Sequence, residues 1–479
     1  MTRFRFSCPI VGGKNERKGS NVGEIGCSII ADSFWLEGPV GMSTQTQPQQ
    51  VQYAAQPWRL ASRAAFRFCF VYFGLFCLTT QIFGSLWPLP NVDVPDPATL
   101  WPMRQIVFWT ASHVFRVTHP LVYTGSGSGD KTFDWVLSFC LLVLAALATG
   151  IWSVLDRRRE NYATLHKWFR VFMRFALASQ MILYGLSKAV PLQMPFPYLT
   201  RLIQPYGSFS PMGVLWSSIG ASPAYEIFAG CAEMLGGVLL VFPRTTMLGA
   251  LVSLADMIEI FALNMTYDVP VKLFSFHLIL MSLILLAPDF SRLAAFFFLG
   301  RDVKPSSEPH LFVTRRANRI ALAVQVAFGI WLVGMNTYGS WTSWHTYGGG
   351  RPKSPLYGIW DVEQFSVDAQ LHPPLFTDRD RWHRAIFDFP TRITFQRPDD
   401  SFAGYGVSIN LNKKTLALTK DSDTKWKANF TFERATKDQL ILDGEMDSHK
   451  IHMQLRLAPA KFLLASRGFH WISEYPFNR

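Results

Sequence analysis

The chain has 479 residues, of which 49% are hydrophobic, and a formal net charge of +12. The apolar residues concentrate between Phe66 and Trp331, so the length accommodates a membrane region and a separate soluble domain. Because Arg and Lys cluster beside apolar runs rather than on a basic module of their own, the charge argues against nucleic-acid binding. The six cysteines form no Cys-x-x-Cys pair, so their spacing encodes neither a disulfide framework nor a metal site.

The N-terminal region 1–58 is polar and lacks helical or strand periodicity, which predicts disorder. Met42 begins a second polar stretch that resembles an ordinary bacterial N-terminus. We therefore interpret residues 1–41 as an extension from a wrongly chosen start.

Seven segments are long and apolar enough to cross about 30 Å of hydrocarbon. The strongly basic flanks of these segments all fall on one side when the chain crosses seven times, and positive flanks face the cytoplasm. We predict a bacterial inner-membrane protein with a cytoplasmic N-terminus and an extracytoplasmic C-terminal domain. The predicted spans are 64–87, 132–154, 169–190, 222–242, 245–265, 270–288 and 316–338.

This topology divides the chain after residue 58 into four regions. The first holds two spans and an extracytoplasmic loop, in which Trp101 to Val117 reads as an interfacial helix with Trp101, Val107, Phe108 and Phe115 on its apolar side. The second is a four-helix core, the third a cytoplasmic linker with the seventh span, and the fourth a soluble domain. Their bounds are 59–168, 169–290, 291–349 and 350–479.

Three acidic residues lie deep in the predicted spans. At about 1.5 Å per residue, Glu233 and Asp256 reach the middle of the membrane, and Glu259 lies one turn further out. A charge in hydrocarbon costs several kcal/mol, so such side chains face a bundle interior. Small residues at four-residue spacing allow the helices that carry them to approach closely, at Ala232 and Gly236 and at Gly249 and Ser253.

Polar partners for these acids occur at a similar depth. Tyr184 and Lys188 end the third span, Asn264 follows in the fifth, and Lys272 and His277 occupy the outer half of the sixth. In one interpretation the set is an ion-pair network that fixes helix register. In the other, acids in excess of bases leave one carboxyl protonated and able to exchange protons with a bound quinol or solute. We assign Glu233, Asp256 and Glu259 as candidate catalytic residues and the other five as ligand-binding candidates.

Short motifs in this region suggest a family. Tyr184-Gly-Leu-Ser-Lys188 ends one span, and the stretch from Glu226 to Gly237 contains Glu-x-x-Gly-Gly before Arg244. With these motifs, segment 175–289 resembles the four-helix DoxX family of bacterial membrane proteins. Some DoxX-type proteins are subunits of thiosulfate:quinone oxidoreductase or are linked to thiol and oxidative-stress chemistry, so the resemblance implies quinone as an electron acceptor. It carries over best to Lys188, Glu233 and Gly236.

The C-terminal domain alternates apolar and polar residues with period two. In 425–432 the side chains of Trp426, Ala428, Phe430 and Phe432 point one way and their neighbours the other. Turn residues separate eight or nine such runs, which predicts an antiparallel β-barrel. Gly358-x-Trp360 with a late Arg467 resembles the lipocalin pattern, in which an arginine covers the tryptophan. Such a barrel either holds an apolar ligand or is filled by its own side chains, and we favour the filled form.

The sequence thus predicts a membrane all-α bundle of seven transmembrane helices followed by a β-barrel. We expect a membrane component of a quinone-linked redox system, with the lipid bilayer and either quinone or a redox protein as partners, no bound metal and no other evident cofactor. The alternative is a non-catalytic membrane scaffold or lipid-binding module whose buried charges are structural. A proton-coupled carrier is less favoured, because no inverted repeat is evident.

Overall fold

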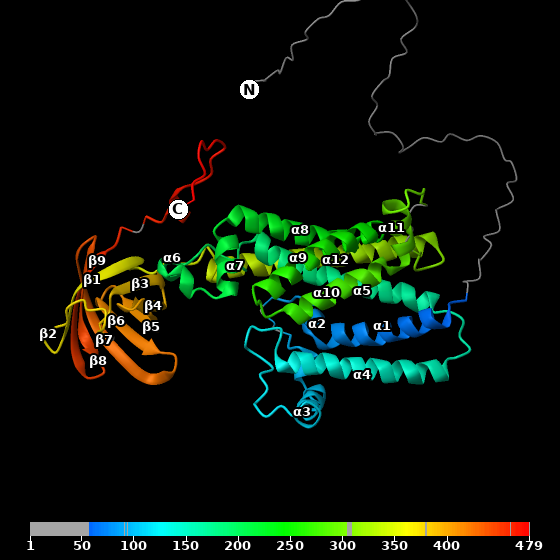
Figure 1. Cartoon of the computed structure of the whole chain (residues 1–479), viewed down its shortest axis with the longest axis horizontal. Coiled ribbons are helices and arrows are strands. Elements are labelled where there is room, and N and C mark those ends of the chain that lie inside the picture. Colours follow the sequence, from blue (N-terminus) through cyan, green and yellow to red (C-terminus); the bar gives the residue numbers. More distant parts are fainter. Residues whose placement is uncertain are drawn as a thin grey trace, which may run out of the picture. The chain divides into compact units, whose positions relative to one another are not determined.

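The computed structural model describes residues 57–90, 92, 94–303, 309–378, 381–459 and 461–478. A set of helices runs from α1 to α12, and the strands β1 to β9 follow (Figure 1). The predicted disorder of 1–58 and the interpretation of its start fall outside the described residues, except for the last two positions.

Six helices in the described part of the chain are long and apolar enough to cross a membrane. They coincide with six of the seven predicted spans. The corresponding segments are Leu60–Thr79 (α1), Thr132–Leu155 (α4), Pro223–Val241 (α8), Pro243–Thr266 (which contains α9, Thr246–Thr266), Lys272–Phe297 (which contains α10, Lys272–Leu286, and α11, Phe290–Phe297) and Arg315–Thr346 (α12). The remaining predicted span, 169–190, is α5 (Ala163–Ala189), which is long enough but carries Arg170, Arg174 and Lys188 and is therefore less apolar.

The first predicted span, 64–87, is not one continuous helix. It breaks at Thr80, whose backbone is extended, and α2 (Gln81–Ser85) follows. The hydroxyls of Thr79 and Thr80 donate to the carbonyls of Leu75 and Phe76 at 2.8 and 2.7 Å. Such side-chain bonds compete with the helical ladder and favour a bend at this point.

The predicted interfacial helix is shorter than expected and packs through only part of the predicted face, which contributes Val107 and Phe108. It is α3 (Met103–His113), and it buries Val107, Thr110 and Ala111. Trp101, which was expected on the apolar side, lies before the helix and is 78% exposed, and Phe115 is also exposed. The contact with α4 therefore combines the small Thr110 and Ala111 with Val107 and the Phe108 ring, which packs on Phe133.

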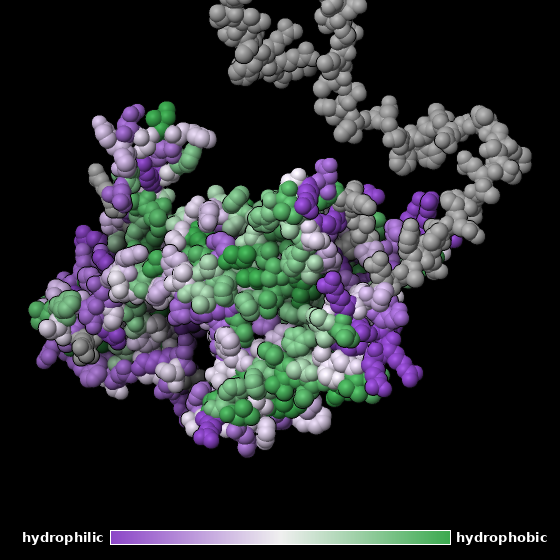
Figure 2. All heavy atoms as spheres, turned by 45° about the vertical axis from the view of Figure 1, so that its right-hand side comes forward, coloured by the Kyte–Doolittle hydropathy of each residue, from purple (hydrophilic) through white to green (hydrophobic). Residues whose placement is uncertain are grey.

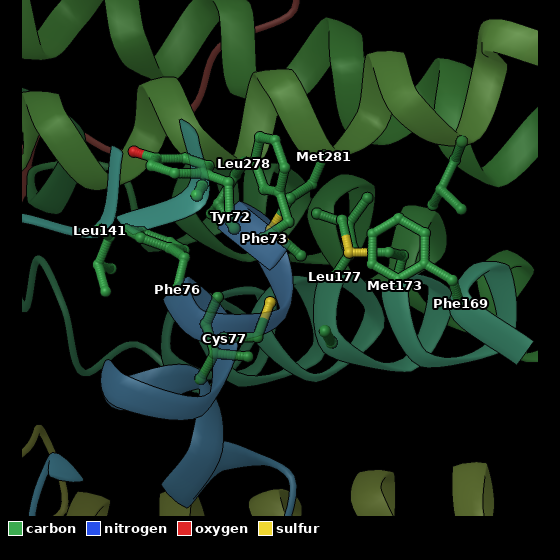
Figure 3. Close-up of a cluster of buried hydrophobic side chains, with 14 of the residues drawn as sticks. Tyr72, Phe73, Phe76, Cys77, Leu141, Phe169, Met173, Leu177, Leu278 and Met281 are labelled. Atoms are coloured by element: carbon green, nitrogen blue, oxygen red, sulfur yellow. The ribbon is translucent and has the colours of Figure 1, made fainter. Parts of the chain in front are cut away.

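The core of the helical part surrounds α1. Phe76 and Cys77 of α1 lie among side chains from α4, α5 and α10, so four helices separated in sequence share one packed interior (Figure 3). Between helices in lipid, this close packing replaces the hydrophobic effect as the main attraction. The other labelled members are Tyr72, Phe73, Leu141, Phe169, Met173, Leu177, Leu278 and Met281.

Hydrophobic residues also cover the outside of the helices, whereas the barrel surface is mainly hydrophilic (Figure 2). On α4 the exposed side chains include Leu147, Ile151, Val154 and Leu155. A helix that is apolar toward both its neighbours and its surroundings is typical of a membrane protein. Several shorter helices were not predicted: α6 Leu199–Ile203, α7 Pro211–Gly220, α11 Phe290–Phe297 and α13 Leu463–Ser466.

The strands form an antiparallel barrel, as predicted. β1 and β3 to β9 pair in sequence order, and β1 pairs with β9 to close the sheet. The short β2 is added beside β1. The bounds are β1 Gly358–Val367, β2 Gln370–Leu371, β3 Arg384–Phe389, β4 Arg392–Gln396, β5 Phe402–Asn410, β6 Thr415–Lys420, β7 Asp423–Thr436, β8 Gln439–Met446 and β9 His449–Leu457.

The barrel interior is filled by its own side chains, and Trp382 stacks on Phe395 with ring centroids 3.6 Å apart. At one end, Trp360 Nε1 donates to the Leu356 carbonyl at 2.9 Å. The guanidinium near the Trp360 ring belongs to Arg434, at 5.8 Å, and not to Arg467 as predicted. Arg467 lies beyond the last strand, after α13, where it covers Phe477.

Truncating a central ring tests this filled interior. Phe395→Ala is expected to destabilise the barrel by about 3–5 kcal/mol, because it removes a fully buried ring and leaves a cavity. Hydrogen exchange of the β4 and β5 amides in the full chain measures the loss. The control Phe469→Ala, at a side chain that is 77% exposed, should leave exchange unchanged. Equal protection in both variants would contradict a packed interior.

Candidate functional site

Glycine residues bring α5 and α8 into backbone contact. A Cβ added at Gly230 would lie 2.3 Å from the Ala189 nitrogen, and one at Gly185 would lie 2.6 Å from the Met234 nitrogen. Only glycine permits this approach. It places the C-terminal end of α5, where Lys188 lies, directly against the middle of α8.

The packing of α8 on α9 sets a second register. A Cβ at Gly236 would lie 2.7 Å from Ser253 Oγ, and one at Gly249 would lie 2.8 Å from the Leu240 nitrogen. Glu233 lies one turn before Gly236 on α8, and Asp256 lies one turn after Ser253 on α9. Because the two helices are antiparallel, these two steps lead to the same end of the pair. The two carboxyls are therefore level across the helix contact.

Lys188 and Glu233 form a buried ion pair, in which Nζ donates to Oε1 and the side chains are 9% and 4% exposed. The second oxygen of this carboxylate, Oε2, has no hydrogen-bond partner within the described residues, and neither do Asp256 Oδ2 and Ser253 Oγ. The charges of Glu233 and Lys188 both act on Asp256. Lys188, Glu233 and Asp256 thus form one row across α5, α8 and α9.

Glu259 does not join this row as a buried group. It lies three residues after Asp256, a rotation that carries its side chain to the exposed side of α9. Its charge still interacts with Glu233 and Lys188. The structure therefore buries Glu233, half-buries Asp256 and leaves Glu259 exposed, and the expectation that all three acids are enclosed is wrong.

Tyr184 borders two cavities on the same side of the bundle as Lys188. Its hydroxyl accepts a hydrogen bond from Gln81 Nε2 at 2.7 Å, and the charge of Glu233 acts on it. One cavity, of about 730 Å³, reaches Asn336 of α12, and the other, of about 260 Å³, reaches the loop before α4.

The loop residue Asp96 lines both cavities. Burial raises the pKa of its carboxyl, and Lys131 partly opposes that shift. Sequence reasoning missed Gln81 and Asp96. The polar triplet Thr79-Thr80-Gln81 inside an apolar run was the available signal for Gln81.

His277 has both ring nitrogens engaged. Nδ1 lies 2.7 Å from the Leu273 carbonyl, which can only accept, so Nδ1 carries the proton. Nε2 then accepts from the Tyr72 hydroxyl at 2.7 Å, and the ring stacks on Phe76 with centroids 4.0 Å apart. These contacts describe a satisfied interior histidine that joins α10 to α1.

Lys272 and Asn264 stabilise the contact between α9 and α10. Lys272 Nζ pairs with Asp268 at 2.8 Å and lies 3.7 Å from Asp130. Asp130 also accepts from the backbone amides of Lys272 and Leu273, which caps the start of α10. Asn264 Nδ2 donates to Ser275 Oγ at 3.1 Å. Neither predicted ligand-binding residue contacts the Lys188–Glu233 pair through these bonds.

At the opposite end of the bundle, two buried arginines of α5 cap other helices. Arg174 donates to the carbonyls of Leu240 and Val241 at 3.0 and 2.7 Å, and Arg170 donates to that of Leu285 at 2.7 Å. These carbonyls lie at the C-terminal ends of α8 and α10, where a cation is favoured. Sequence analysis assigned these two arginines no role.

Among the residues that the structure describes, no three or more His, Cys, Asp or Glu side chains gather in a way that could hold a metal ion. The arrangement that remains is a buried ion pair, a second carboxyl level with it, and a hydrogen-bonded tyrosine facing two cavities.

In the described part of the chain, six helical segments are long and apolar enough to cross a membrane and an antiparallel barrel follows them, an architecture that suggests a membrane protein. The chain is 36% identical over 121 residues to the uncharacterised protein YwoB of Bacillus subtilis (strain 168), a match that covers 25% of this chain and 74% of YwoB. The chain therefore belongs to the family of YwoB. No family model matches the chain, and no solved structure matches it.

Proposed function

We propose that the chain is an integral protein of the bacterial inner membrane in which α5 is a seventh crossing helix. Its 27 residues extend about 40 Å, more than the hydrocarbon thickness. Of its four Lys and Arg residues, Lys167 lies near the start of the helix, and the bundle satisfies the other three, since Arg170 and Arg174 cap helices and Lys188 pairs with Glu233. A charged residue is tolerated in a membrane helix under these conditions.

Contacts at one end of the bundle support the orientation. Arg63 donates to the Arg159 carbonyl, and Lys167 donates to the His310 carbonyl in the linker before α12. Arg174 links this end to the turn between α8 and α9, which carries Arg244. The basic flanks therefore share one end, which we assign to the cytoplasm by the positive-inside rule. The barrel then lies outside the cytoplasm.

Within this membrane protein, we assign the core as DoxX-like and its function as the membrane component of a quinone-linked redox system. The observation that carries the proposal is the row Lys188–Glu233–Asp256, in which one oxygen of each carboxyl has no partner among the described residues, together with Tyr184, which lines two cavities and senses the charge of Glu233. Gln81 and Tyr184 supply hydrogen-bond donors suited to a quinone carbonyl. Reducing a quinone to a quinol takes two electrons, from a thiol or sulfur donor or a partner protein, and two protons, which would come from water and pass through Asp256 and the Lys188–Glu233 pair.

Titration of a short-chain quinone analogue into the purified full chain tests this function. We expect saturable binding that falls at least about tenfold in Tyr184→Phe, which removes a hydroxyl that lines the cavities, or in Asp256→Asn, which removes a charged group of the row. The control Asp302→Asn, on the exposed linker after α11, should bind like the wild type. Wild-type affinity in both site variants, with helical content retained, would contradict the proposal.

The alternative is a membrane scaffold in which the same pair only locks α5 to α8. The backbone contacts at Gly185 and Gly230 favour it, because they surround the pair with tightly packed helix. The double variant Lys188→Met/Glu233→Met separates the two functions. If the pair only locks the helices, packing is sufficient and the double variant should behave like the wild type. If the pair exchanges protons, the double variant should keep its fold but lose quinone-analogue binding or the pH dependence of that binding.

A further inference from the structure

An apolar groove opens at the end of the bundle that carries the basic flanks, between α5 and α12. Its volume is about 470 Å³, and nearly all of its lining is carbon. Trp168 is 46% exposed, Phe312 42%, Ile320 57% and Val324 62%, so this apolar wall faces the surroundings. Lined by Val171 and Phe175 on one side and Phe328 on the other, the groove follows the direction of both helices.

The cytoplasmic linker is folded to close the end of this groove. Asn318 accepts from the Phe312 amide at 3.0 Å and donates to the Phe312 carbonyl at 2.7 Å. This pair of bonds fixes Phe312, whose ring meets Trp168 edge-on with centroids 5.8 Å apart. The Thr314 side chain caps the start of α12 through the Ala317 amide. These contacts fix the linker in place, so the groove has a defined end.

Two cationic side chains, Lys167 and Arg316, lie near the closed end of the groove. Lys167 precedes Val171 by one turn of α5, and Arg316 precedes Ile320 by one turn of α12, so each lies in line with a residue of the groove wall. Lys167 uses one of its three donors on the His310 carbonyl at 3.0 Å. Arg316 is exposed and has no ion-pair partner among the described residues, and Arg315 and Arg319 are exposed beside it.

We propose that this groove binds an anionic phospholipid, with one acyl chain along the apolar wall and the phosphate at Lys167 and Arg316. The occupant follows from charge complementarity, because an apolar channel that ends in cations matches a chain that ends in a phosphate. Negatively charged lipids are also concentrated in the cytoplasmic leaflet, where each nearby Lys or Arg adds about 1 kcal/mol of attraction. The site rests on the membrane orientation proposed above, but not on quinone binding.

Native mass spectrometry of the purified full chain, titrated with phosphatidylglycerol or phosphatidylcholine, measures the site directly. We expect wild-type protein to retain phosphatidylglycerol more strongly. Lys167→Gln/Arg316→Gln should weaken that retention about thirtyfold, or about fivefold for each cation, and should leave phosphatidylcholine unchanged. Ala321→Phe, which fills the groove and keeps the cations, should also weaken retention of phosphatidylglycerol.

The matched control is Arg157→Gln/Arg158→Gln, which removes two cations from the same end of the bundle outside the groove. It should retain phosphatidylglycerol like the wild type. The proposal fails if this control loses as much affinity as Lys167→Gln/Arg316→Gln, because attraction would then be diffuse. It also fails if Ala321→Phe binds normally, or if inorganic phosphate displaces the lipid. Quinone-analogue binding, measured on the same variants, should persist, so failure here leaves the proposed function untouched.

Discussion

Lys188→Met is expected to lower the free energy of unfolding by about 3–5 kcal/mol, because it leaves the Glu233 carboxylate buried without its cation. Glu233→Met should cost a similar amount by stranding the ammonium group. The double variant Lys188→Met/Glu233→Met should recover most of the loss, since it buries no charge. Equilibrium unfolding of the full chain in mixed micelles gives the three values.

The double variant decides this prediction. Recovery to within about 1 kcal/mol of the wild type would identify removal of one partner as the damage. If the double variant is as unstable as either single variant, the side chains matter through their shape or other contacts, and the ion-pair argument is wrong. Helix content by circular dichroism shows whether all three proteins are folded before unfolding begins.

Gly230→Ala should be at least as damaging, with an expected loss of about 3 kcal/mol or more. The added Cβ meets the backbone of α5 at the Ala189 nitrogen, which cannot move aside as a side chain could. The two helices must separate, and the Lys188–Glu233 contact should lengthen with them. The same unfolding measurement tests this.

The matched control is Gly150→Ala on α4, where an added Cβ meets nothing within 4 Å. Alanine favours helix over glycine by up to about 1 kcal/mol, so this variant should be neutral or slightly more stable. Comparable destabilisation in both variants would mean that glycine matters for the helix itself and not for the contact between helices.

Hydropathy and charge predicted most of the helices, because a membrane-length helix is determined by the composition of one continuous segment. The predicted span 132–154 coincides with α4 (Thr132–Leu155) almost residue for residue. The break at Thr80 and the short α6 and α7 were missed, because they depend on individual hydrogen bonds and tertiary packing. Period-two alternation predicted the barrel because it is also a local pattern. It could not show which arginine lies near Trp360.

The candidate site was only partly accessible from sequence. Small residues and depth predicted that Glu233 and Asp256 meet, and the glycine contacts place them level. The partner of Glu233 is 45 positions away in the chain and that of His277 is 205, so one sequence cannot give these pairs. Glu259 shows the limit of depth alone, because depth does not fix which way a side chain points around the helix.

Closure of the barrel has a consequence for how its sequence can be connected. Since β1 pairs with β9, with Trp360 opposite Leu457, the beginning and end of the domain are adjacent strands. A short link between them, with a new opening in an exposed hairpin, would keep every strand beside its present neighbours. The domain should therefore tolerate circular permutation. The order of its strands along the chain determines where the domain joins the helices, but the barrel does not require that order.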